Sequence, residues 1–152
     1  MFVEYKSNRD KTPEPIIMAI PYIKNILEGM NIPILEQEGF EADDIIGTVA
    51  KKAEKKNFNV FMVTPDNDFS QLVSENIFLC KPARMGNGME IWGTKEVNEK
   101  FEVSSPEQVI DFLGMMGDSV DNIPGLPGVG EKTAKKFLKE YGSLENLLSN
   151  SH

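Results

Sequence analysis

Seven of the 24 acidic residues stand in three short clusters, and each cluster lies beside an apolar run or a glycine-rich turn. The clusters are Glu41-Ala-Asp43-Asp44, Asp66-Asn-Asp68 and Asp118-Ser-Val-Asp121. Carboxylates carried by different elements repel one another when a fold brings them together, unless cations neutralise them. The pattern therefore predicts a fold that gathers the three clusters around divalent metal ions.

The overall charge does not exclude a nucleic-acid partner. The net charge of −8 becomes −1 when the seven clustered carboxylates are set aside, so the rest of the chain is nearly neutral and contains basic stretches. Phosphate binding depends on local positive charge rather than on the sum over the chain. DNA thus remains a possible partner.

Length and composition indicate a globular chain of 152 residues with 40% hydrophobic residues, enough for one domain or a domain with a small appendage. The single cysteine, Cys80, allows no internal disulfide, which indicates a reducing compartment, and it is expected to be a small buried hydrophobe. No stretch approaches the roughly 18 apolar residues of a membrane span. We expect a soluble, cytoplasmic protein with no membrane partner.

The hydrophobic pattern predicts an α/β fold. A helix should run from Thr12, as its cap, to about Gly29, with a kink or a break at Pro21, and residues 1–9 should end a preceding helix. A strand at 32–35, a helix from about Glu41 and a strand at 59–64 imply a parallel sheet. Strands at 77–81 and 89–92 should pair across the turn at 85–88, and helices should cover 94–101, 106–116, 131–141 and 143–148.

The first two acidic clusters allow a structural as well as a chemical interpretation. Glu41 and Asp44 share a helix face, yet acids also favour a helix amino terminus for electrostatic reasons alone. Asp66 and Asp68 follow a buried strand, where parallel sheets place ligands, but Asp68 could also cap the next helix. A calcium-binding EF-hand loop is excluded because Ser70 and Gln71 stand where that loop needs a ligand and a glycine.

The third cluster has the three-residue spacing of a helix face and leads into a glycine-rich run from Gly125 to Gly130. Glu131 separates Gly130 from Lys132, which excludes a Walker A loop, and the glycine order excludes a dinucleotide fingerprint. The remaining interpretation is a helix-hairpin-helix unit whose glycine amides form a phosphate cradle.

The helix after this hairpin has two faces. Its apolar stripe consists of Ala134, Phe137, Leu138 and Tyr141, and its basic stripe of Lys132, Lys135, Lys136 and Lys139. A lysine stripe is often only a solvated face, but beside exposed glycine amides it favours contact with a nucleic-acid backbone. The basic run from Lys51 to Lys56 has no such neighbour and is interpreted as solvated.

Five segments, in this order and spacing, resemble the 5′ nuclease domain of bacterial DNA polymerase I, a relative of the flap endonucleases. They are Tyr5-Lys6-Ser-Asn-Arg9, Gly39-Phe-Glu41-Ala-Asp43-Asp44, Thr64-Pro-Asp66-Asn-Asp68, Gly117-Asp118-Ser-Val-Asp121-Asn-Ile-Pro-Gly125 and Gly128-Val-Gly130-Glu-Lys-Thr-Ala134. The resemblance covers essentially the whole chain. It implies a PIN-like parallel-sheet core over 1–104, with the remnant of a helical arch, and a helix-hairpin-helix DNA-binding module over 105–152.

The resemblance also assigns roles by position. The metal-site acids are Glu41, Asp43, Asp44, Asp66, Asp68, Asp118 and Asp121, expected to hold two Mg²⁺ or Mn²⁺ ions. Lys6 and Arg9 are the arch bases at the cut phosphate, and Tyr5 steers the single strand. The DNA-binding hairpin residues are Gly128, Val129, Gly130, Lys132, Thr133, Lys135 and Lys136, with a K⁺ ion expected beside Val129.

The chain departs from this family at its start, since it lacks the first apolar strand ending in Asp and a second Asp-bearing strand. We therefore interpret it as part of a longer 5′ nuclease that acts on duplex DNA with a 5′ flap or 5′ end and is joined to a polymerase portion. The uncovered sheet edge is expected to favour self-association. Two rival functions remain: a duplex-binding module without catalysis, and a PIN-type ribonuclease.

Overall fold

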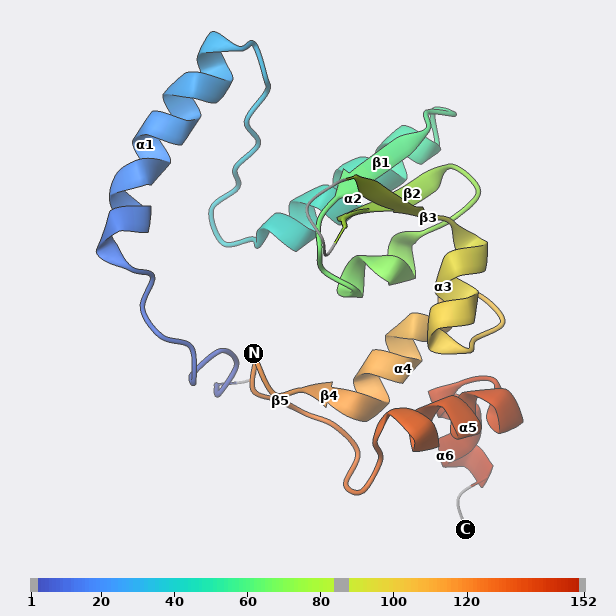
Figure 1. Cartoon of the computed structure of the whole chain (residues 1–152). Coiled ribbons are helices and arrows are strands. Elements are labelled where there is room, and N and C mark those ends of the chain that lie inside the picture. The colour runs from blue at the N-terminus through green and yellow to red at the C-terminus, as the bar shows by residue number, and fades with distance from the viewer. Residues whose placement is uncertain (1–2, 84–87, 151–152) are drawn as a thin grey trace.

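The computed structural model describes residues 3–83 and 88–150, and Figure 1 shows the order of their elements. The longer helices and strands are α1 (Glu14–Gly29), α2 (Ala42–Glu54), β1 (Val60–Val63), β2 (Ile77–Pro82), β3 (Met89–Trp92), α3 (Thr94–Phe101), α4 (Gln108–Met116) and α5 (Glu131–Tyr141). The short elements are the 3-10 helix η1 (Asp68–Leu72), the two-residue strands β4 (Gly117–Asp118) and β5 (Ile123–Pro124), and α6 (Leu144–Asn150). The predicted α/β class is confirmed.

The main sheet has three strands in the order β1-β2-β3. β1 and β2 run parallel with Val60 opposite Ile77, and β2 and β3 run antiparallel with Leu79 opposite Trp92. The predicted pairing of the last two strands is confirmed, while residues 85–87 of the turn predicted at 85–88 lie outside the described residues.

The predicted strand at 32–35 is wrong. These residues form no regular structure, and the backbone N–H of Ile32 donates instead to the carbonyl of Leu27 at 2.9 Å, near the end of α1. Pro33 has no N–H to give to a sheet. The parallel partner of β1 is therefore β2, which comes later in the chain.

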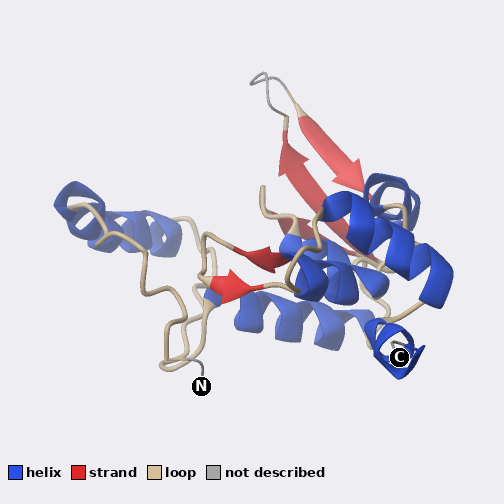
Figure 2. Ribbon diagram, turned by 90° about the horizontal axis from the view of Figure 1, so that it is seen from below, coloured by secondary structure: helices blue, strands red, loops and turns tan. Residues whose placement is uncertain are grey.

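The amino-terminal part also differs from the predictions. Residues 3–8 form turns rather than the end of a helix, α1 is capped by Pro13 rather than Thr12, and α1 continues through Pro21 without a break. Over the described residues 3–49, no residue is buried. In Figures 1 and 2, α1 accordingly stands apart from the sheet and from the other helices.

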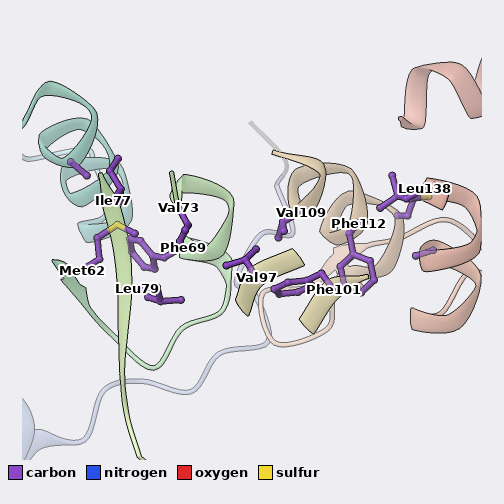
Figure 3. Close-up of a cluster of buried hydrophobic side chains, with 13 residues drawn as sticks. Met62, Phe69, Val73, Ile77, Leu79, Val97, Phe101, Val109, Phe112 and Leu138 are labelled. Carbon is purple, nitrogen blue, oxygen red and sulfur yellow. The ribbon is translucent and has the colours of Figure 1, made fainter. Parts of the chain in front are cut away.

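One hydrophobic core joins the sheet to the carboxyl-terminal helices (Figure 3). Met62, Ile77 and Leu79 from the sheet belong to the same buried cluster as side chains from α3, α4 and α5. Phe101 and Phe112 meet edge to face, with ring centroids 5.3 Å apart. Cys80 is buried in β2, as predicted, and is 5% exposed. This continuous packing fixes the acid-bearing ends of β1 and α4 in one body.

β1 lies at one edge of the sheet, beside an open apolar groove of about 440 Å³ that it shares with α2. Leu35, Ile46, Val49 and Phe61 are among the residues that line this groove. Phe61 and Val63 are 55% and 67% exposed, so the outer face of β1 is apolar and uncovered. Within the described part of the chain, no helix is long and apolar enough to cross a membrane.

Candidate active site

The first acidic cluster begins α2. The backbone N–H of Glu41 donates to Asp44 Oδ2 at 3.0 Å, which is one half of a capping box. For Asp44, the alternative that an acid stabilises the amino terminus of a helix is therefore confirmed. Asp43 and Asp44 both line a hollow of about 360 Å³ that also contains Asp68. The start of α2 thus presents carboxylates toward the second cluster.

The second acidic cluster follows the carboxyl end of β1. Asp66 Oδ1 accepts the backbone N–H of Asp68 at 2.9 Å, and Thr64 Oγ1 accepts that of Asp66 at 3.2 Å. Asn67, not Asp68, is the residue that precedes η1 as its cap, so the capping alternative for Asp68 is wrong. Because Asp66 makes the turn, the carboxylate of Asp68 is left to face the hollow.

The third acidic cluster lies in a tight turn, not on a helix face as its spacing predicted. β4 and β5 pair antiparallel, with Asp118 opposite Ile123, and residues 119–122 form the turn between them. Asp118 Oδ1 accepts the N–H of Val120 at 2.7 Å and that of Asp121 at 3.4 Å. These bonds close the turn around the carboxylate of Asp118.

The neck of this turn is a close backbone crossing between Gly117 and Gly125. A Cβ at Gly117 would lie 2.8 Å from the Cα of Gly125, and one at Gly125 would lie 2.6 Å from the carbonyl oxygen of Met115. Real Cβ atoms do not approach this closely. The two glycines therefore let β4 and β5 meet where α4 ends.

The three clusters lie within electrostatic range of one another. Desolvation, followed by repulsion from Asp66, Asp118, Asp43 and Asp121, raises the pKa of Asp68. Burial, and then the charges of Asp66 and Glu41, raise the pKa of Asp43. Carboxylates from α2, from the end of β1 and from the β4–β5 turn therefore resist being charged together.

The donor chemistry fits a hard divalent cation, because carboxylate oxygens are the ligands that Mg²⁺ and Mn²⁺ prefer. Across residues 3–83 and 88–150, no three His, Cys, Asp or Glu side chains lie close enough together to hold a metal ion. The acids face one another without forming a closed set of ligands. A bound cation would relieve the repulsion that raises the pKa values of Asp43 and Asp68.

This repulsion predicts that Asp68→Asn stabilises the metal-free protein at pH 7. The folded state holds the Asp68 proton more tightly than the unfolded state, so charging Asp68 costs stability as pH rises through its raised pKa. The gain should stay below about 1 kcal/mol because the side chain is exposed, and it should vanish at about pH 3, where Asp68 is protonated in both the folded and the unfolded state. Urea unfolding in EDTA at both pH values measures it. An equal gain from Glu75→Gln, a charge loss in the turn before β2, would contradict this explanation.

A basic segment, residues 4–9, lies against the first and third clusters. The Lys6 ammonium binds Glu41 and lies 3.8 Å from Asp121 Oδ2, and the Arg9 guanidinium binds Asp121 Oδ1. The Tyr5 hydroxyl is 3.4 Å from Glu41 Oε2. The bonds to Glu41 and then to Tyr5 hold the pKa of Lys6 above its ordinary value, so its ammonium stays charged. The bases thus link the start of α2 to the β4–β5 turn.

The helix-hairpin-helix unit consists of α4, the glycine-rich run and α5. Gly128 has a φ of 77°, which suits a glycine, and the N–H of Val129 donates to the carbonyl of Leu126 at 3.0 Å. Gly130 caps α5, and the N–H of Thr133 donates back to its carbonyl at 3.0 Å. Ala134 and Leu138 are buried, as the apolar stripe predicted, whereas Phe137 and Tyr141 of the same stripe are only half-buried.

The basic stripe of α5 is divided. Lys132, Lys136 and Lys139 are exposed. Lys135 is half-buried and pairs with Glu131 at 2.9 Å and Glu102 at 3.1 Å, and the bond to Glu131 raises its pKa. The charge of Lys135 is therefore compensated by acids, which its spacing in the sequence did not predict.

Two asparagines that the sequence did not mark as site residues join the basic segment to the β4–β5 turn. The Asn122 amide donates to the carbonyl of Glu4 at 2.8 Å and to Ser7 Oγ at 3.1 Å, and the Asn8 amide donates to the carbonyl of Ser119 at 2.9 Å. The sequence signal for Asn122 is weak, since asparagine tolerates the left-handed conformation that it adopts here. No spacing rule pairs residues that are more than 100 positions apart.

Comparison with known proteins identifies the family. Residues 1–102 match the model of the 5′-3′ exonuclease N-terminal resolvase-like domain, and residues 104–152 match that of the 5′-3′ exonuclease C-terminal SAM fold. A 5′-3′ exonuclease of Aquifex aeolicus is 45% identical over 150 residues, which cover 99% of this chain and 50% of that protein. DNA polymerase I of Bacillus subtilis is 46% identical over 147 residues, 97% of this chain and 17% of that protein.

The fold has relatives among solved structures. The flap endonuclease of bacteriophage T5, in a pseudo-enzyme-product complex with DNA and metal ions, superposes with a TM-score of 0.80 at 23% identity. The match covers 98% of this chain and 57% of the phage protein. The chain thus spans about half the length of the Aquifex relative and a smaller share of the polymerase. Over both of its parts, this chain belongs to the 5′-3′ exonuclease family.

Proposed function

We propose that the chain forms the catalytic part of a 5′ nuclease that cuts duplex DNA at a 5′ flap or 5′ end. The observation that carries the proposal is the convergence of three acidic clusters from separate elements, the first and third of which bind the cations Lys6 and Arg9. Metal-site acids beside arch bases are the arrangement that the family resemblance predicts. The family membership and the fold support the same activity.

In this proposal, two Mg²⁺ or Mn²⁺ ions would be held by the seven clustered acids, which are Glu41, Asp43, Asp44, Asp66, Asp68, Asp118 and Asp121. Such ions activate water and stabilise the leaving oxygen in phosphodiester hydrolysis. Lys6 and Arg9 then offset the negative charge that develops on the phosphate, because their charged groups already lie beside the acids. Tyr5 packs against the Lys6 ammonium, 4.8 Å from ring centroid to nitrogen, and orients it.

A fluorescent 5′-flap duplex tests this activity. We expect Mg²⁺-dependent release of the labelled flap, and no release in EDTA. Absence of cleavage at every Mg²⁺ and Mn²⁺ concentration would reject catalysis by this chain. Preferential cutting of single-stranded RNA would favour the ribonuclease alternative instead.

The second candidate function is a duplex-binding module without catalysis. One observation favours it: among the described residues, no three acidic side chains lie close enough together to hold a metal ion. Both candidates share the hairpin around Val129, in which the amides of Gly128 and Gly130, with the Thr133 hydroxyl, hold a DNA backbone phosphate, since the Val129 N–H already donates to Leu126. A K⁺ ion held by backbone carbonyls near Val129 would add positive charge there.

Lys132→Ala and Lys136→Ala should each weaken duplex binding, since both side chains are exposed beside the hairpin. Loss of one phosphate contact lowers the slope of log affinity against log salt by about 0.9. Fluorescence anisotropy with a labelled duplex, at several salt concentrations, measures that slope. Lys56→Ala removes the same charge at a position far along the chain from the hairpin, and it should leave the slope of log affinity against log salt unchanged. Equal losses in all three variants would assign binding to net charge alone.

We further propose that the longer protein joins this chain to a polymerase portion, as in the DNA polymerase I relatives, and acts in the bacterial cytoplasm.

We also propose that the apolar outer face of β1 is a contact surface and that it favours self-association of the isolated chain. Sedimentation across a range of protein concentrations tests this, and a strictly monomeric chain would reject it.

A further inference from the structure

The basic segment is held in place by polar contacts. Over the described residues 3–49 no residue is buried, so no apolar anchor fixes residues 4–9 to the body of the protein. Their contacts with the β4–β5 turn are of two kinds. One kind is ionic, from Lys6 and Arg9 to Asp121. The other kind is uncharged and runs through asparagine side chains and the backbone.

The uncharged contacts form a reciprocal arrangement that we call the asparagine clasp, made by Asn8 and Asn122. Each asparagine donates its side-chain amide to a backbone carbonyl of the other segment, Asn122 to Glu4 at 2.8 Å and Asn8 to Ser119 at 2.9 Å. Between them the backbone N–H of Lys6 donates to the carbonyl of Asp121 at 2.9 Å. Asn122 adds a bond to Ser7 Oγ at 3.1 Å, so it supplies two of these bonds.

We propose that Asn122 is a positioning residue that keeps Lys6 and Arg9 beside the acidic site when their ionic partners are occupied. This inference rests on the proposed nuclease function. Cations bound by Glu41 and Asp121 would compete with the bases for the same carboxylate oxygens, and a DNA phosphate would draw the bases away. The amide-to-carbonyl bonds depend on neither charge, so the clasp persists through both events.

The backbone conformation adds a second reason. Lys6 has a φ of 57°, a strained left-handed conformation for a residue with a long side chain. Such strain persists only where surrounding contacts impose it. The bonds from Asn122 to Glu4 and Ser7 bracket Lys6 on both sides, and the Lys6 N–H is itself bonded to the turn. The clasp therefore fixes the conformation that aims the Lys6 side chain.

Asn122→Gly separates the hydrogen bonds of the Asn122 side chain from the left-handed backbone conformation of that residue. Its φ is 57°, which glycine adopts freely, so the turn is retained while both amide bonds are lost. Asn122→Asp keeps the side-chain shape but presents an oxygen to the Glu4 carbonyl. The matched control is Asn57→Gly, since Asn57 has a φ of 61° and lies between α2 and β1, at the opposite end of β1 from Asp66.

The first measurement is trypsin cleavage after Lys6 and Arg9, followed by mass spectrometry on the full chain without metal, at a salt concentration of about 1 M that screens the ion pairs of both bases. Cleavage of an opened segment tracks the open population when reclosing is fast. We expect roughly tenfold faster cleavage in Asn122→Gly and Asn122→Asp, as the loss of two hydrogen bonds implies. Asn57→Gly should match the wild type. The proposal would be overturned if trypsin cleaved Asn122→Gly as slowly as the wild type, or if it cleaved Asn57→Gly as fast as Asn122→Gly.

The second measurement is single-turnover cleavage of the 5′-flap duplex, compared with duplex affinity. Asn122→Gly should slow cleavage about tenfold and leave affinity unchanged, because the hairpin is untouched. In an Arg9→Ala background, Asn122→Gly should slow cleavage by a smaller factor than it does in the wild type, because Asn122 acts through the bases. Fully additive losses would assign Asn122 a general structural role. Absence of wild-type cleavage would instead reject the proposed nuclease function, and trypsin would still decide whether the clasp exists.

Discussion

Replacing Asp118 with Asn should lower flap cleavage by at least about 100-fold, since even residues that only orient metal ligands are worth 10- to 100-fold. Asn retains the Oδ1 that accepts the N–H groups of Val120 and Asp121, so the turn keeps its shape while the charge is lost. Asp118→Ala loses the charge and both acceptor bonds. Single-turnover assays with Mg²⁺ compare the two variants, and duplex anisotropy checks that binding is retained.

Glu75→Gln is the matched control for Asp118→Asn. It removes the same charge from an exposed position before β2, and cleavage should stay at the wild-type rate. If Asp118→Asn retained cleavage within tenfold of the wild type, Asp118 would not hold a metal ion. If only Asp118→Ala lost activity, the contribution of Asp118 would be to the turn rather than to the chemistry.

Gly125→Ala should lower the free energy of unfolding by about 2 to 3 kcal/mol, near the upper end for overpacking. The added Cβ would lie 2.6 Å from the Met115 carbonyl oxygen and closer still to that of Met116. These atoms are backbone at the end of α4, and the Met115 carbonyl also accepts the N–H of Leu126 at 2.8 Å, so neither side gives way easily. Urea unfolding followed by circular dichroism measures the loss.

Gly114→Ala provides the comparison for Gly125→Ala. Gly114 lies inside α4, and a Cβ at this position would have no atom within 4 Å, so alanine there should be neutral or stabilise by up to about 1 kcal/mol. A change of less than about 0.5 kcal/mol in Gly125→Ala would show that β4 and β5 separate readily. We also expect Gly125→Ala to reduce flap cleavage, because the crossing places Asp118 and Asp121.

The elements that sequence predicted well are those with strong local signals. α3 and α5 begin and end at the predicted residues, because each has an apolar stripe and a glycine at its start. The segment 32–35 misled because its β-branched residues favour a strand, whereas the Ile32 N–H is used at the end of α1. The spacing of Asp118 and Asp121 misled because three-residue spacing also occurs in a tight turn closed by Asp118 itself.

The sequence alone determined which residue types are present and the local structure around them: the acids that begin α2 and follow β1, the glycines that shape the hairpin, and the stripe that buries Ala134 and Leu138. These follow from interactions within about four residues along the chain. Only the tertiary structure decided which groups meet. Lys135 pairs with Glu102 because the shared core includes both α3 and α5. Lys6 meets Glu41, and Asn122 meets Glu4 across 118 positions, through polar contacts outside that core, which no local spacing predicts.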